Sequence, residues 1–262
     1  MAEAPRWDGD GGVYFSDVLG GGVYRWSPAG VETLLAKRRG VGGLALCAGG
    51  GLVVSGRTVV LAKDGETSAV LEPDEGVTGF NDMATGPGGR LYVGALRFRP
   101  FAGEDPVPGD VWRIDPDGSA ELLFRGIMWP NGIGVSPDGG TLYCCDYSTG
   151  TLIAHDLDQR GNTSAWRLLA ASDSGEADGL AIDAEGGIWV ATGNGASLIR
   201  FDAGGSLCEI LEVPAPFVSA LCFGGPDMSE LYVTTMGGDN GGSLLRTSSP
   251  VPGLRMAACA LG

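Results

Sequence analysis

The sequence predicts an all-β protein that folds as a single domain, a six-bladed β-propeller. One short apolar strand recurs six times along the 262 residues. Glycine accounts for 47 residues and often stands in pairs between apolar runs, which indicates many tight turns and short strands. Repeats of about 40–50 residues that contain only strands and turns are typical of propeller blades.

The recurring strand follows a turn rich in glycine or aspartate. Its six copies read GVYFSD, GLVVSG, RLYVGA, TLYCCD, GIWVAT and ELYVTT. Aligned on their third residue, successive copies are separated by 39, 39, 51, 46 and 43 positions. The aligned residues are Tyr14, Val53, Tyr92, Tyr143, Trp189 and Tyr232. A β-sandwich would not need six such copies, so the repeat favours the propeller.

Each copy continues into a further strand, as in GGVYRWSP and GDVWRIDPDG, and no segment remains for a second domain. The predicted blades cover residues 1–40, 41–78, 79–127, 128–175, 176–215 and 216–262. The first repeat begins almost at Met1, so little chain precedes it to complete another blade. We therefore expect the C-terminal segment GLRMAACALG to supply the outer strand of the last blade.

Charge and cysteine usage exclude several classes of protein. The formal net charge is −15, and the only basic cluster is KRR at Lys37–Arg39, so we expect no nucleic-acid or membrane partner. The six cysteines form no C-x-x-C pair, and most lie in apolar strands, as expected for free thiols. The N-terminus lacks an apolar signal region, and no apolar run reaches membrane-spanning length. The sequence thus predicts a cytoplasmic protein.

Four repeats carry an oxygen-bearing side chain at one position, 11 or 12 residues before the aligned residue. These residues are Glu3, Asn81, Asn131 and Asp178, whereas the second and sixth repeats have Gly42 and Ser219 near this position. The position corresponds to the start of the innermost strand. We therefore expect the four side chains to converge at one mouth of the central channel.

Two carboxylates and two carboxamides are hard oxygen ligands with a summed charge of −2. Such a set favours one divalent metal ion, and Ca²⁺ suits it best, with Mn²⁺, Mg²⁺ and Zn²⁺ as alternatives. Asn131-Gly132 and Asp178-Gly179 could instead be ordinary turn dipeptides. That alternative does not explain Glu3 or Asn81, which no glycine follows.

Several of these segments resemble one known family. EAPRWD, FNDMATGPGGRLYVGAL, PNGIGVSPDGGTLYCCD and DGLAIDAEGGIWVA are similar, in order, to motifs of the senescence marker protein, gluconolactonase and luciferin-regenerating enzyme family. The resemblance implies a six-bladed propeller with one divalent metal and lactone-hydrolase activity. It implies that Glu3, Asn131 and Asp178 bind the metal, that Asp178 is also the general base, and that Asn81 lines the pocket.

The chain departs from the family pattern at two positions. The family opening E-G-P is here Glu3-Ala4-Pro5, and the arginine that often stands two residues before the pocket asparagine is replaced by Gly79. Such an arginine would bind the hydroxyls or carboxylate of a sugar acid. Its loss argues against gluconolactone as the substrate.

The pocket is expected to be apolar and partly covered. The insert LRFRPFAGEDPVPGD follows the third copy and would form a lid. The predicted pocket side chains are Phe80, Phe98, Phe101, Trp129 and Met236. They suggest a small-molecule substrate larger and more apolar than a sugar lactone.

The predicted mechanism uses the metal as a Lewis acid and Asp178 as the base, while Asn81 and Asn131 orient the carbonyl. The single histidine, His155, is expected at the surface or an edge, away from the channel. Two alternatives stay open. The scaffold could catalyse a non-hydrolytic cyclisation, isomerisation or condensation, or it could be a binding module with a structural ion. The sequence leaves the oligomeric state open.

Overall fold

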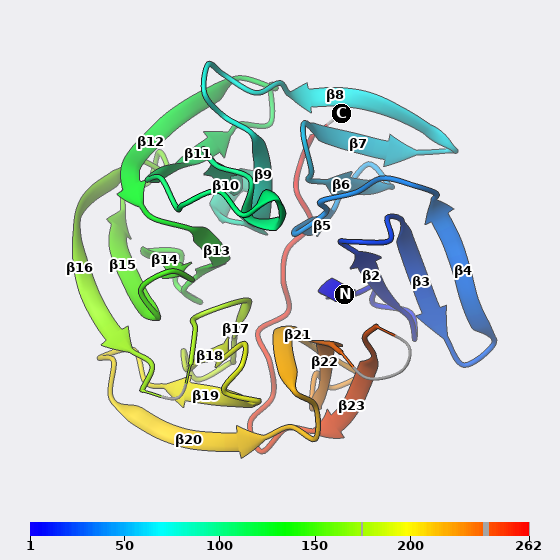
Figure 1. Cartoon of the computed structure of the whole chain (residues 1–262), viewed down its shortest axis with the longest axis vertical. Coiled ribbons are helices and arrows are strands. Elements are labelled where there is room, and N and C mark those ends of the chain that lie inside the picture. The colour runs from blue at the N-terminus through cyan, green and yellow to red at the C-terminus, as the bar shows by residue number, and fades with distance from the viewer. Residues whose placement is uncertain (174, 238–240, 262) are drawn as a thin grey trace.

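The computed structural model describes residues 1–173, 175–237 and 241–261. Six antiparallel sheets surround a central channel in one domain, so the predicted all-β propeller fold is confirmed (Figure 1). In each sheet the first strand in sequence is innermost, and neighbouring strands in sequence are neighbours in the sheet. Among the described residues, the 3₁₀ turns are η1 (Pro87–Gly89) and η2 (Pro100–Ala102).

The first three sheets each contain four strands. The first consists of β1 (Ala2–Trp7), β2 (Val13–Asp17), β3 (Val23–Ser27) and β4 (Gly30–Leu35). The second consists of β5 (Leu44–Leu46), β6 (Leu52–Val54), β7 (Val59–Lys63) and β8 (Glu66–Leu71). The third consists of β9 (Gly79–Thr85), β10 (Leu91–Leu96), β11 (Gly109–Ile114) and β12 (Ala120–Ile127).

The last three sheets contain four, four and three strands among the described residues. The fourth consists of β13 (Pro130–Val135), β14 (Thr141–Asp146), β15 (Thr151–Leu157) and β16 (Thr163–Ala171). The fifth consists of β17 (Leu180–Ile182), β18 (Ile188–Ala191), β19 (Ser197–Phe201) and β20 (Leu207–Glu212). The sixth consists of β21 (Phe217–Gly224), β22 (Glu230–Met236) and β23 (Leu244–Ser248).

The hydrophobic core lies between neighbouring blades. The fully buried Tyr92 of the third blade belongs to one cluster with Leu142 and Cys144 of the fourth. Trp189 of the fifth blade is also fully buried and meets Phe223 of the sixth edge-on. The aligned strand therefore recurs in the sequence because each copy packs against the next blade around the ring.

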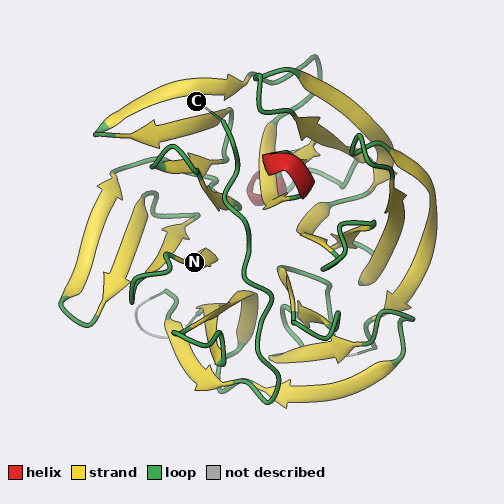
Figure 2. Ribbon diagram, turned by 180° about the vertical axis from the view of Figure 1, so that it is seen from behind, coloured by secondary structure: helices red, strands yellow, loops and turns green. Residues whose placement is uncertain are grey.

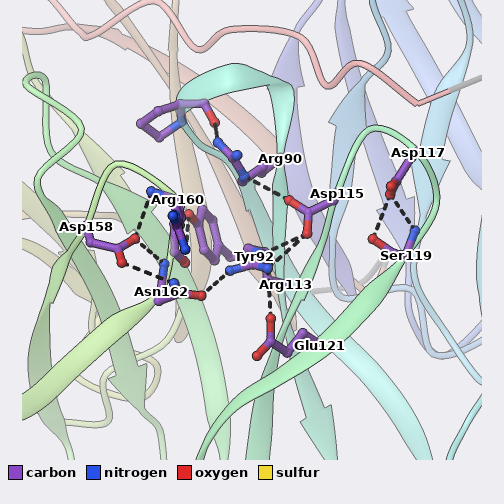
Figure 3. Close-up of polar contacts among 12 residues, drawn as sticks. Arg90, Tyr92, Arg113, Asp115, Asp117, Ser119, Glu121, Asp158, Arg160 and Asn162 are labelled. Atoms are coloured by element: carbon purple, nitrogen blue, oxygen red, sulfur yellow. Dashed lines mark hydrogen bonds and ion pairs between the residues drawn. The ribbon is translucent and has the colours of Figure 1, made fainter.

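Polar contacts join the third and fourth blades at a more exposed position. Arg113 pairs with Asp115 and Glu121 of its own blade and donates from Nη1 to Asn162 Oδ1 of the next blade at 2.5 Å (Figure 3). Arg90 also pairs with Asp115, at 2.8 Å. The network adds directional contacts to the apolar packing between these blades.

The ring closes between the sixth and first blades without a shared strand among the described residues. The first blade is built from one continuous N-terminal stretch. Trp7 of β1 stacks on Tyr232 of β22 with ring centroids 5.7 Å apart. Side-chain packing and inner-strand contacts therefore close the ring.

The C-terminal segment, residues 250–261, crosses one face of the propeller, so the expected outer strand of the last blade is wrong (Figure 2). The N–H of Leu254 donates to the carbonyl of Ile182 in the fifth blade at 2.9 Å, and that of Cys259 donates to Leu46 in the second at 2.8 Å. Cys259 and Leu261 are buried in a cluster with the second and third blades. Burial of these apolar residues draws the segment across the channel.

The segment covers the channel end where the inner strands finish. A cavity of about 550 Å³ there is lined by Trp7 near the end of β1, by Thr85 at the end of β9 and by Leu254 and Met256 of the C-terminal segment. The other end of the channel, where the same strands begin, remains accessible.

His155 is buried, at 2% exposure, so its expected surface position is wrong. It lies in β15, and its ring stacks on Phe124 of the third blade with centroids 3.8 Å apart. Its Nδ1 lies 3.1 Å from the carbonyl oxygen of Ser164. The ring lies between the third and fourth blades, so His155 lines neither channel cavity.

All six cysteines are free thiols, of which Cys208 alone is exposed. Within the described ranges, no helix is long and apolar enough to cross a membrane.

Candidate metal centre and active-site pocket

The four predicted oxygen-bearing residues lie at the accessible end of the channel. Glu3 is the second residue of β1, Asn81 the third of β9 and Asn131 the second of β13, while Asp178 precedes β17 by two residues. These inner strands surround the channel in Figure 1. All four residues line one cavity of about 500 Å³.

Hydrogen bonds between blades fix the positions of these residues. The N–H of Gly132 donates to the carbonyl of Asp178 at 3.0 Å, which sets the residue after Asn131 against the fifth blade. Asn81 donates from Nδ2 to the carbonyl of Pro130 at 2.9 Å. The Asn81 amide therefore keeps its oxygen and one N–H for other partners.

The structure explains why the second and sixth blades have no oxygen ligand at the equivalent position. A side chain at Gly42 would displace the Asn81 amide, since its Cβ would lie 1.9 Å from Oδ1 of Asn81. Ser219 instead donates from Oγ to the carbonyl of Ala2 at 2.8 Å, with Thr234 Oγ1 3.0 Å away. These positions make room for Asn81 and join the last blade to the first.

The Asp178 carboxylate is buried, at 1% exposure. Neither of its oxygens has a partner with good hydrogen-bond geometry in the part of the chain that the structure describes, although the Asn131 amide lies near enough to act on its pKa. Glu3 is 5% exposed, and its Oε2 accepts a hydrogen bond from the Ala4 N–H at 2.7 Å. A buried carboxylate without a partner is costly in a protein interior, which indicates that a cation belongs beside it.

The donor set fits a hard divalent cation. Glu3, Asn131 and Asp178 offer oxygen atoms, and Asn81 adds another at the rim of the same cavity. The set contains only two carboxylates, and no cluster of three or more histidine, cysteine, aspartate or glutamate residues suited to a metal occurs among the described residues. A cation here would therefore also need the carboxamide oxygens. An oxygen-only set with two carboxylates is of the kind that calcium and magnesium prefer.

Ala4, between Glu3 and Pro5, has a φ of +52°, in the left-handed region that favours glycine. The register of β1 against β2 shifts between Glu3 and Arg6, so the strand bulges there. The resulting conformation lets the Ala4 N–H reach the Glu3 carboxylate. Backbone strain thus coincides with a candidate metal ligand.

The apolar residues predicted for the pocket line the same cavity, and these are Phe80, Phe98, Phe101, Trp129 and Met236. Phe98 meets Trp129 edge-on with centroids 5.3 Å apart. Phe101, in η2 of the insert, is 62% exposed, so it lies at the outer rim.

Sequence reasoning missed Tyr147, which packs on Trp129 with centroids 4.4 Å apart and lines the cavity. Asp146 holds the Trp129 backbone in place, since its Oδ1 accepts the Trp129 N–H at 3.1 Å. The motif TLYCCD ends at Asp146, directly before Tyr147. The position directly after this strand copy was therefore the sequence feature that could have pointed to Tyr147 as a pocket residue.

It also missed a buried ion pair deeper in the channel. Arg6 Nη2 lies 2.9 Å from Asp82 Oδ1, and both side chains are less than 8% exposed. Arg6 also donates to the carbonyls of Leu44 and Met83, while Asp82 Oδ2 accepts the Ile133 N–H at 3.2 Å. Through these bonds the pair connects the first four blades. It lies just beneath the site, because Arg6 and Asp82 are close in sequence to Glu3 and Asn81 respectively.

Burial and neighbouring charges favour the protonated forms of both candidate carboxylates in the metal-free protein. Burial raises the pKa of the Glu3 carboxyl to about 8, against the opposing effect of the Ala4 N–H, and the Asp82 charge adds to the rise. Burial, followed by the charges of Glu3 and Asp82, raises the pKa of Asp178 well above its ordinary value. A bound cation would take the place of these protons.

The stability of the metal-free protein is therefore expected to fall as pH rises. The Glu3 carboxyl ionises near its ordinary pKa of 4.5 in the unfolded chain but near 8 in the folded one. Between these values the folded state binds more protons, so a rise in pH favours unfolding. We expect the Tm of chelator-treated protein to drop by about 5 °C between pH 5 and pH 8, and calcium to restore it at pH 8.

Glu3→Gln should flatten this pH dependence, because the amide does not ionise. A metal-free Tm that rises across the window, or one that calcium leaves unchanged at pH 8, would contradict the assignment of these carboxylates to a cation site.

Comparison with known proteins assigns the chain to a family. A family model described as SMP-30/Gluconolactonase/LRE-like region matches residues 1–237. The pentonolactonase XacC of Haloferax volcanii is 30% identical over 254 residues, which cover 93% of this chain and 84% of that protein. Regucalcin of Xenopus laevis is 33% identical over 248 residues, with coverages of 90% and 83%.

The fold comparison agrees with the sequence comparison. The solved structure of a luciferin-regenerating enzyme superposes with a TM-score of 0.88 at 25% identity and covers 99% of this chain and 95% of its own. The resemblance noted in the sequence motifs is thereby confirmed: the chain belongs to the SMP-30/gluconolactonase/LRE-like family.

Proposed function

We propose that this protein hydrolyses the lactone ring of a small molecule and depends on one divalent cation, for which calcium is the best fit. The observation that carries the proposal is the buried Asp178 carboxylate, which lacks a hydrogen-bond partner among the described residues and lines a cavity with Glu3, Asn131 and Asn81. The similarity to a pentonolactonase supports the reaction class.

Glu3, Asn131 and Asp178 would hold the cation, which supplies a Lewis acid that polarises the lactone carbonyl when bound. Asp178 would accept a proton from the attacking water and return it to the ring oxygen as the acyl bond breaks. The product is then a hydroxy acid. The remaining N–H of Asn81 and the Asn131 amide would orient the carbonyl and stabilise the charge on its oxygen.

The cavity favours a substrate with an apolar body over gluconolactone. One wall includes Phe80, Phe98, Trp129 and Met236, whose side chains would pack against the apolar body of a substrate. Hydroxyls buried against such a wall would lose their hydrogen bonds with water. Gly79 likewise provides no side chain to bind them.

The direct test combines metal titration with a panel of lactones. Chelator-treated protein is titrated with Ca²⁺, Mn²⁺, Mg²⁺ or Zn²⁺ while acid release is followed from gluconolactone, dihydrocoumarin and a long-chain lactone. We expect metal-dependent hydrolysis, with kcat/KM for dihydrocoumarin at least about tenfold above that for gluconolactone.

Each other outcome has a definite meaning. Equal rates on gluconolactone and dihydrocoumarin would remove the apolar preference. Metal binding without hydrolysis of any lactone would favour non-hydrolytic chemistry on the same scaffold. An absence of metal binding would return the four residues to a structural role.

A further inference from the structure

Two arginines of the accessible channel mouth line the same cavity as Asp178. Arg39 follows the first blade, and Arg57 lies in the turn between β6 and β7 of the second. Both side chains are exposed. The adjacent Arg38 is half-buried, and its guanidinium group donates hydrogen bonds to the backbone carbonyls of Ser55 and Thr58.

Neither Arg39 nor Arg57 has a side-chain hydrogen bond or an ion pair with any residue that the structure describes. Most of the described arginines, by contrast, have a carboxylate partner, as expected in a chain with 32 acidic and 17 basic residues. Even on the same rim, Arg99 pairs with Glu104, and Arg97, two residues earlier, pairs with Asp110 at 2.6 Å. Two guanidinium groups without a partner among the described residues thus border the cavity that holds the candidate carboxylates and amides.

The backbone holds Arg57 beside the candidate reaction site. Gly56 and Phe80 exchange two backbone hydrogen bonds, of 2.7 and 3.3 Å, which attach the turn before Arg57 to β9 next to Asn81. A Cβ on Gly79 would lie 3.2 Å from the Gly56 carbonyl oxygen and 3.8 Å from Cα of Arg57. Because position 79 carries no side chain, the space beside Arg57 stays open.

We propose that Arg57 and Arg39 form an anion subsite that binds a carboxylate, or a similar anionic group, carried by the substrate in addition to its lactone ring. Guanidinium groups bind such anions through paired, charge-assisted hydrogen bonds. Together with the aromatic wall, this subsite defines the substrate class as an apolar lactone with an anionic substituent. The inference rests on the proposed hydrolase function, since the anion belongs to its substrate.

The subsite is tested with two substrates that differ in charge alone, a carboxylated dihydrocoumarin and its carboxamide. At low salt, we expect Arg57→Gln to reduce kcat/KM for the carboxylated substrate about 10- to 100-fold, mainly by raising KM. The kcat/KM for the carboxamide should change by no more than about twofold. Arg39→Gln should act in the same direction, and Arg57→Lys should retain part of the preference. Arg160→Gln, which removes an exposed arginine outside the cavity, is the matched control and should change neither substrate.

The two substrates also separate substrate binding from product binding. Ring opening creates a carboxylate from either lactone. If the arginines bound only the product, replacing them would therefore change the kinetics of both substrates. An equal loss on both substrates in Arg57→Gln, or no preference for the carboxylate in the unsubstituted protein, would overturn the subsite while leaving lactone hydrolysis in place.

A binding measurement distinguishes failure of the subsite from failure of the hydrolase. The lactam analogue of the carboxylated substrate and its carboxamide are titrated by calorimetry into calcium-loaded protein and into Arg57→Gln. Tighter binding of the lactam carboxylate that depends on Arg57, without hydrolysis of either lactone, would support the subsite and refute the hydrolase. Equal binding of the two lactams would overturn the subsite whether or not lactones are hydrolysed.

Discussion

Replacing Asp178 with asparagine is expected to abolish hydrolysis while preserving the fold. The substitution keeps the shape of the side chain but removes the charge that would hold the cation and the base that would accept the proton of water. We expect kcat to fall by about 10³-fold or more and calcium binding to weaken in calorimetric titrations. At pH 8 the metal-free variant should be at least as stable as the parent, because it no longer buries a carboxyl group whose ionisation burial opposes.

Asp183 offers a matched control close to the same strand. Its carboxylate is also fully buried, but it accepts hydrogen bonds from Trp189 Nε1 at 3.0 Å and from Arg200 Nε at 2.7 Å. Asp183→Asn should therefore lower the Tm with or without calcium and retain the stabilisation by calcium. Asp178→Asn that kept its activity, or that lost stability as Asp183→Asn does, would show that Asp178 is a structural residue.

The propeller could be predicted from the sequence because its packing is periodic. Tyr92 and Trp189 occupy equivalent buried positions between blades, so the same strand pattern had to recur. The periodicity also brought Asn131 and Asp178 to one end of the channel, since equivalent positions in a closed ring face the same axis. The absence of an oxygen ligand in the second repeat, by contrast, is explained by the structure, where Asn81 fills the space beside Gly42.

Contacts that are not periodic could not be predicted in this way. The burial of His155 depends on Phe124 of another blade, and the path of the C-terminal segment depends on apolar surface at the channel end. The subsite arginines have no repeat signature either, because Arg57 gains its position from the pairing of Gly56 with Phe80. Such features follow from how blades meet, which the linear pattern of a single blade does not contain.

The buried pair of Arg6 and Asp82 is another contact between blades, and breaking it is expected to have the largest effect on stability. Arg6→Met leaves the Asp82 carboxylate buried without its cation, at an expected cost of about 3–5 kcal/mol in the free energy of unfolding. Asp82→Asn leaves the Arg6 guanidinium in the same situation. Urea unfolding of the calcium-loaded variants measures both losses.

The double variant shows whether the pair acts as a unit. If the loss in each single variant comes from an unpaired buried charge, Arg6→Met/Asp82→Asn should be less destabilised than the sum of the two by about 1–3 kcal/mol. Strictly additive losses would show that the two charges are not coupled. Because Asp82 also accepts the Ile133 N–H at 3.2 Å, both single variants should shift β9 against β13 and weaken calcium binding together with stability. Asp178→Asn should weaken calcium binding alone, so the two classes of variant separate the residues that hold the cation from those that position them.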